Sequence, residues 1–251
     1  AVAFFLSLVA LVALGTALDR RRGWIAGLGA AVLTAMGLDH LAMTLFPMSE
    51  TTTLLATILV TLGVVRLVPR PGWVPALGIG GFLLLGALVR YNLPLPLLAA
   101  LLVDHVWTHR RSPRDIASPH VLLWVAPIAG VFALWQIAQP NLLDNVEKFL
   151  VNRSSGLEFW SAENLLFVPR TALADYLGQA WLGAVLLIAF VAGLAPALLD
   201  EERHGETGPF QWTFLAGRPL RVVQLSVLAS VAALTLHDYK IDRNLYALLP
   251  L

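Results

Sequence analysis

The chain has 251 residues, of which 58% are hydrophobic and 13% are charged, and its formal net charge is +1. A soluble domain has roughly 25% charged residues, and the mean hydropathy here is +0.74, so a soluble globular class is excluded. The low net charge and the lack of a basic stripe exclude nucleic-acid binding. The chain contains no cysteine, which excludes disulfides and thiolate metal sites. The composition therefore predicts an all-α, polytopic transmembrane helix bundle.

The chain begins at Ala1, inside an apolar run and with no charged leader. This start is not typical of a signal peptide. We therefore expect residues 1–251 to be a single transmembrane domain, and to be the core of a longer protein that is truncated at both ends.

Eight apolar stretches come close to the ~20 residues that cross a bilayer as a helix. They cover residues 1–18, 24–46, 51–67, 73–89, 93–107, 119–139, 178–199 and 221–236, and a further one begins at Tyr246. Only Arg90, Tyr91 and Asn92 separate 73–89 from 93–107. This pair is expected to form a tight hairpin or two short, broken helices.

The distribution of lysine and arginine between the connections predicts the orientation. Alternation of the spans places eleven of them on one side, which is then cytoplasmic: Arg20, Arg21, Arg22, Arg66, Arg70, Arg110, Arg111, Arg114, Arg203, Arg218 and Arg221. The outer side receives six: Arg90, Lys148, Arg153, Arg170, Lys240 and Arg243. Glu50 and the closing segment 237–244 (HDYKIDRN) are expected on the same outer side as Arg90.

The longest outer connection, 140–177, contains a second kind of helix. Its apolar residues recur at helical spacing between polar ones, as expected for an amphipathic helix that lies in the membrane interface. The apolar positions are Leu142, Leu143, Val146, Phe149 and Leu150.

Four short segments carry a resemblance to a known family. They are 22–28 (RGWIAGL), 47–53 (PMSETTT), 86–92 (GALVRYN) and 239–250 (YKIDRNLYALLP). In this order they resemble the membrane-embedded GT-C glycosyltransferases, such as the protein mannosyltransferases and the lipid A aminoarabinose transferases. The resemblance implies an inverting hexosyl- or pentosyl-transferase of the bacterial inner membrane. It also implies a polyprenyl-phosphate-linked sugar as donor, and a lipid, glycan or protein as acceptor.

In this family the best-known catalytic carboxylate lies in the first outer loop, which would precede Ala1. The family also has Arg-Tyr before Leu-Leu-Pro, whereas Asn244 follows Arg243 here and Tyr246 is displaced. The catalytic base therefore stays unassigned, with Glu50 and Asp39 as the candidates within the chain.

Sugar transfer from a polyprenyl phosphate requires a cation at the phosphate leaving group and a base at the acceptor. Arg90, Lys240 and Arg243 are the outer-side candidates for the cation, because arginine in particular suits bidentate phosphate contacts. The alternative is that these side chains only extend to lipid headgroups. Glu50 has an alternative role in the first turn of a helix, where an acid favours the helix dipole.

Asp39 and His40 lie within an apolar run, where an ionisable group is a functional candidate. Further polar candidates on the outer face are Tyr91, His237 and Asp238. His237 and Asp238 are too few ligands for a metal site, so no cofactor is assigned and a divalent metal stays open.

At the inner edge, Asp104, His105 and His109 are interpreted as a solvated helix end.

Two other functions compete with glycosyl transfer. A secondary transporter or lipid carrier is favoured by the short spans 73–89 and 93–107. A non-catalytic membrane protein is the third alternative.

Overall fold

The computed structural model of the chain describes residues 2–19, 23–36, 50–90, 93–109, 118–138, 188 and 217–236, and these residues form helices and short turns without strands. The helices are α1 (Val2–Leu18), α2 (Gly23–Met36), α4 (Glu50–Leu67), α5 (Trp73–Val89), α6 (Pro94–His109), α8 (Pro119–Ala138) and α12 (Arg218–Leu236). The all-α class is thus confirmed for the described part of the chain.

The described helices follow the apolar stretches closely, and α5 coincides with the predicted span 73–89. Of the predicted span 24–46, α2 accounts for the residues up to Met36. Helices α5 and α6 are both continuous, which favours a hairpin over two short, broken helices. The carbonyl of Arg90 accepts the N–H of Leu93 at 2.9 Å in their connection. The outer loop 140–177, the stretch from Tyr246 and, apart from Ile188, the span 178–199 lie outside the described residues.

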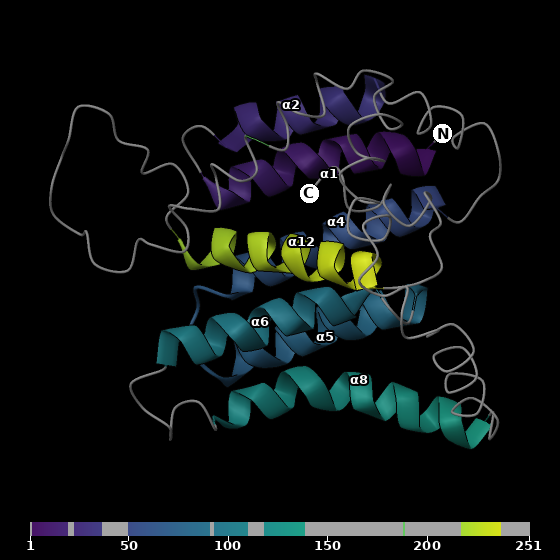
Figure 1. Cartoon of the computed structure of the whole chain (residues 1–251), viewed down its shortest axis with the longest axis vertical. Helices are drawn as coiled ribbons and strands as arrows, with labels where there is room; N and C mark the ends of the chain where they lie inside the picture. The colour runs from purple at the N-terminus through teal and green to yellow at the C-terminus, as the bar shows by residue number, and fades with distance from the viewer. Residues whose placement is uncertain are drawn as a thin grey trace, which may run out of the picture.

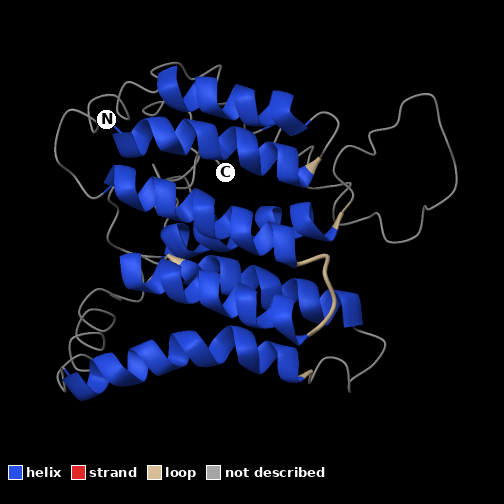
Figure 2. Ribbon diagram, turned by 180° about the vertical axis from the view of Figure 1, so that it is seen from behind, coloured by secondary structure: helices blue, strands red, loops and turns tan. Residues whose placement is uncertain are grey.

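The helices lie side by side in a stack, with neighbouring helices running either parallel or antiparallel to one another (Figure 1). Along the stack α2 packs on α1, α1 on α4, α4 on α5 and α5 on α8. Helix α12 packs mainly on α6, although the two are more than a hundred residues apart in sequence. The view from behind shows the same order of layers (Figure 2).

From α1 to α8 the successive helices alternate in direction, and α12 runs in the same direction as α8, so the helix ends fall into two groups at opposite ends of the bundle (Figure 1). One end carries the first residue of α4, Glu50, the C-cap of α5, Arg90, and the last residue of α12, Leu236. We call it the Glu50 end. The opposite end carries Arg70 and the first residue of α12, Arg218. We call it the Arg218 end.

Two apolar clusters form the core. The first joins α4, α5, α6, α8 and α12 around fully buried residues such as Val64, Leu83 and Leu101. The second joins α1, α2, α4 and α12 around Leu11 and Ile58. Helices α4 and α12 both contribute to the two clusters and so join them into one bundle.

The contact between α5 and α8 depends on a glycine and a proline. Pro127 lies inside α8 and has no N–H, so the carbonyl of Leu123, four residues earlier, loses its usual helical donor. A Cβ on Gly80 of α5 would overlap this same carbonyl oxygen. Only glycine lets α5 approach the freed carbonyl this closely.

Among the described helices, α8 is long and apolar enough to cross a membrane. Helices α1, α2, α4 and α5 contain apolar segments that are shorter. Large apolar side chains are exposed on several of these helices, and examples are Phe5, Leu28, Trp73, Leu88 and Ile137. Exposed apolar surface of this extent marks a lipid or protein contact rather than a water-facing surface.

Candidate functional site

Of the residues predicted at the outer face, the structure describes the position of two. Glu50 is the first residue of α4. Arg90 is the C-cap of α5, where its N–H donates to the carbonyl of Gly86 at 2.9 Å. The two therefore share the Glu50 end of the bundle, as the alternation of spans predicted. The other candidates lie outside the described residues: Asp39, His40, Tyr91, His237, Asp238, Lys240 and Arg243.

A buried ion cluster lies toward the opposite end, the Arg218 end. The carboxylate of Asp104 on α6 is fully buried and accepts two hydrogen bonds from α12. The Nε of Arg218 donates to Oδ2 at 2.6 Å, and the Nε of Arg221 donates to Oδ1 at 2.7 Å. Arg221 also donates from Nη2 to the hydroxyl of Thr108 at 3.0 Å. The interpretation of Asp104 and His105 as a solvated helix end is therefore wrong, since both are buried.

The helical repeat explains why these side chains meet. Arg218 and Arg221 are three residues apart on α12 and so share one face, and Asp104 and Thr108 are four apart on α6 and also share a face. Packing α6 on α12 brings the two faces together. Both carboxylate oxygens are thus occupied, which offsets the large desolvation penalty of a buried charge.

His105 and His109, also four residues apart, form a second stripe on α6. Their ring centroids are 4.4 Å apart, and His105 meets Trp124 of α8 edge-on at 5.6 Å. His109 also contacts the carbonyl of His105 through Nδ1 at 2.9 Å. This stripe faces a cavity, whereas the Asp104 stripe faces α12.

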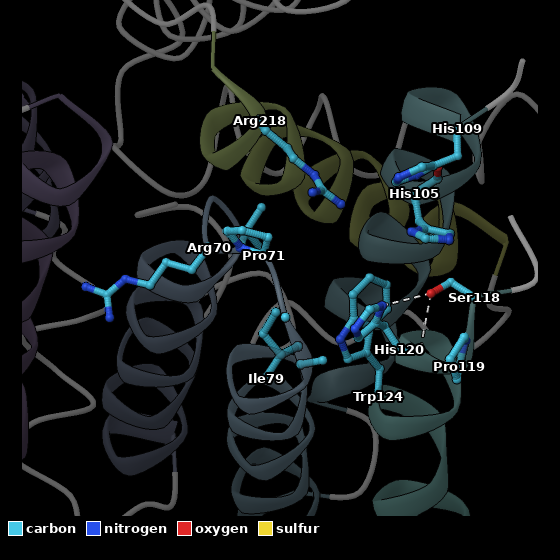
Figure 3. A pocket seen from close by; sticks show the side chains of 13 residues that line it. Arg70, Pro71, Ile79, His105, His109, Ser118, Pro119, His120, Trp124 and Arg218 are labelled. Atoms are coloured by element: carbon cyan, nitrogen blue, oxygen red, sulfur yellow. Dashed lines mark hydrogen bonds between the residues drawn. The ribbon is translucent and has the colours of Figure 1, made fainter. Parts of the chain in front are cut away.

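The cavity has a volume of about 430 Å³ and opens between the ends of α5, α6, α8 and α12. Its lining combines the turn between α4 and α5 with the first turns of α8 and α12. The polar lining residues are Arg70, His105, His109, Ser118, His120, Trp124 and Arg218. In Figure 3 the guanidinium of Arg218 extends toward the histidines, while the Arg70 side chain extends away from them.

Two lining groups in the first turns of α8 differ in whether they have a hydrogen-bond partner. Ser118 contacts Nδ1 of His120 through its hydroxyl at 2.8 Å and accepts the N–H of His120 at 3.4 Å, which caps the helix (Figure 3). The indole Nε1 of Trp124 is buried, and no described residue accepts its hydrogen bond. A buried N–H without an acceptor is unusual in a folded protein.

The backbone also contributes positive potential to this cavity. Helices α5, α8 and α12 all begin at this end, and a helix N-terminus carries the positive end of its dipole. Gly72, before α5, adopts φ 114°, a left-handed conformation that favours glycine, and α5 receives no side-chain cap there. These helix ends, Arg218 and the Trp124 indole supply hydrogen-bond donors to the cavity, whose lining residues include no carboxylate.

No group of three or more metal-ligating side chains occurs within the described ranges. Arg218, the Trp124 indole and the nearby helix N-termini can donate hydrogen bonds to an anion in the cavity and attract its charge. In sequence, the visible signals for the cluster are an acid in an apolar run and two arginines spaced three apart at the start of a span. The sequence does not show that α6 packs on α12, and this packing is what brings the acid and the arginines together.

No protein-family model, curated protein or solved structure matches the chain.

Proposed function

We propose that the protein is a multi-pass membrane glycosyltransferase that moves a sugar from a polyprenyl-phosphate donor to an acceptor at the Glu50 end. The observation that carries the proposal is the common position of three distant chain segments. The start of α4, the end of α5 and the end of α12, which precedes the segment 237–244, lie at one end of the bundle. The extensive exposed apolar surface supports a membrane-embedded bundle, and the four sequence segments support the reaction class.

In this mechanism the acceptor hydroxyl attacks the anomeric carbon, the bond to the phosphate oxygen breaks, and the configuration inverts. Arg90, together with Lys240 and Arg243, stabilises the negative charge that develops on the departing polyprenyl phosphate. A preorganised donor at such a position contributes about 10²- to 10³-fold to the rate. Glu50 and Asp39 are the candidate bases within the chain.

The test is release of polyprenyl phosphate from labelled polyprenyl-phosphate hexoses and pentoses by the protein in membranes. We expect Arg90→Ala to lower the rate by roughly 10²-fold or more, because the leaving group then loses its cation, and Arg243→Ala to act similarly. The matched control is Arg66→Ala, since Arg66 is an exposed arginine in the last turn of α4, toward the opposite end, and does not line the cavity there. Equal rates for Arg90→Ala and Arg66→Ala would remove the site assignment.

A secondary transporter or lipid carrier is the second candidate, and the buried ion cluster of α6 and α12 favours it. Buried ionisable groups in membrane segments commonly mark ion or substrate pathways. Asp104 is, however, only five residues from the end of α6, which is about 7.5 Å at 1.5 Å per residue. Transporter sites lie near the bilayer midplane in repeated elements. Uptake by proteoliposomes that is abolished by Asp104→Asn, without any sugar transfer, would favour the carrier.

A further inference from the structure

We propose that the cavity at the Arg218 end is a binding site for a phosphate group, carried either by a lipid or by a small soluble molecule. The proposal goes beyond glycosyl transfer and does not depend on it, because the cavity and the Glu50 end are at opposite ends of the bundle.

The first argument for a phosphate ligand is the positive charge beside the cavity. Two guanidinium groups and one carboxylate leave the ion cluster with a formal charge of +1. Arg218 uses its Nε to bind Asp104, so this bond does not involve its two terminal Nη groups. The Arg218 side chain is 31% exposed and lines the cavity. A guanidinium with this geometry is well suited to phosphate oxygens.

The second, independent step is the unpaired indole. Trp124 is only 5% exposed and lines the cavity, yet its Nε1–H has no acceptor within the described part of the chain. Indole nitrogen is a donor only, so its partner must be an acceptor such as a phosphate oxygen. His120 lines the same cavity, and its contact with Ser118 uses Nδ1 and leaves Nε2 outside that bond.

The lining also argues against other ligands. A cation would have to compete for Asp104, whose two oxygens already accept from arginines. A neutral sugar could use the histidines and Ser118, which both donate and accept, but it would gain little from the charge of Arg218 or from the N-terminal ends of α5, α8 and α12. Helix N-termini are frequent phosphate sites. The volume of about 430 Å³ leaves room for the group to which the phosphate is attached.

The experiment uses the full chain, purified in phosphate-free detergent, with two probes. Inorganic phosphate is titrated by calorimetry, and phosphatidic acid is offered in nanodiscs of phosphatidylcholine, with bound lipid counted by native mass spectrometry. Saturable binding of inorganic phosphate alone supports a soluble phosphorylated ligand. Retention of phosphatidic acid over phosphatidylcholine supports a lipid headgroup.

Two variants assign the site. Trp124→Phe removes the N–H but keeps an aromatic ring against His105, so folding is preserved, and we expect about 10-fold weaker binding. Arg218→Gln removes the charge, and we expect a loss of about 10²-fold. The matched controls are Trp135→Phe on the same helix and the exposed Arg66→Gln, and both should bind as the wild type does. If neither probe binds saturably, or if both site variants bind normally, the proposal is overturned.

Discussion

At the scale of single residues, the packing of α6 on α12 at the Arg218 end depends most on Asp104. Its side chain is fully buried and bridges α6 to two arginines of α12. A buried ion pair is not necessarily more stable than an apolar replacement of the whole set, but removing one partner leaves an uncompensated buried charge. The contribution of Asp104 is therefore to fix how α6 and α12 meet.

We expect Asp104→Asn to lower the free energy of unfolding by about 3–5 kcal/mol, since the guanidinium groups lose the charge that balances them. Reversible unfolding in detergent, followed by circular dichroism, measures this change. Arg221→Met should be more destabilising than Arg218→Met, because Arg221 is less exposed, at 12% against 31%, and also binds Thr108. Arg66→Gln, on an exposed arginine, is the control. A loss for Asp104→Asn no greater than for this control would contradict a structural role of the cluster.

The ion cluster could not be predicted from the sequence. An acid near the end of an apolar stretch is equally compatible with a solvated helix end and with a buried ion pair. The difference depends on a partner 114 residues away, and no local pattern in α6 identifies α12 as its neighbour. The outer-face candidates other than Glu50 and Arg90 stay predictions, because they lie outside the described residues.

At the scale of elements, the helices could be predicted well from the sequence. Continuous apolar stretches bounded by polar residues set where each helix begins and ends, as α5 illustrates. The helix contacts were not predictable in the same way, because they depend on small residues that allow close approach. Gly80 against the carbonyl of Leu123 is an example, in which the effect of Pro127 on α8 determines the residue needed on α5.

We expect Gly80→Ala to destabilise the protein by about 1–3 kcal/mol, because the added Cβ overlaps the Leu123 carbonyl and must push α5 from α8. The adjacent Gly81 provides a matched control, since a Cβ there meets no atom within 4 Å. Gly81→Ala should be neutral or stabilising by up to about 1 kcal/mol through helix propensity. Midpoints of thermal unfolding of the two variants in the same detergent measure the difference. Equal midpoints would show that α5 and α8 do not pack through Gly80.

At the scale of the whole molecule, the alternating directions of the helices relate the two proposed sites. The order of the spans predicted this alternation, which the described helices show from α1 to α8, with Glu50 and Arg90 at one end of the bundle. The same alternation puts the cavity of the Arg218 end on the side predicted to be cytoplasmic. A phosphate site there and a glycosyl-transfer site at the Glu50 end would therefore face opposite leaflets.

The chain contains no cysteine, so single cysteines can report the side on which each end lies. We expect a membrane-impermeant maleimide to label Arg90→Cys in intact cells and Arg70→Cys only after permeabilisation, because the two residues lie at opposite ends of α5. The cysteine-free wild type is the control and should give no label. Labelling of both variants from the same side would contradict a membrane-crossing α5. Labelling with the sides exchanged would keep the bundle but reverse its orientation, and would place the proposed glycosyl transfer on the cytoplasmic face.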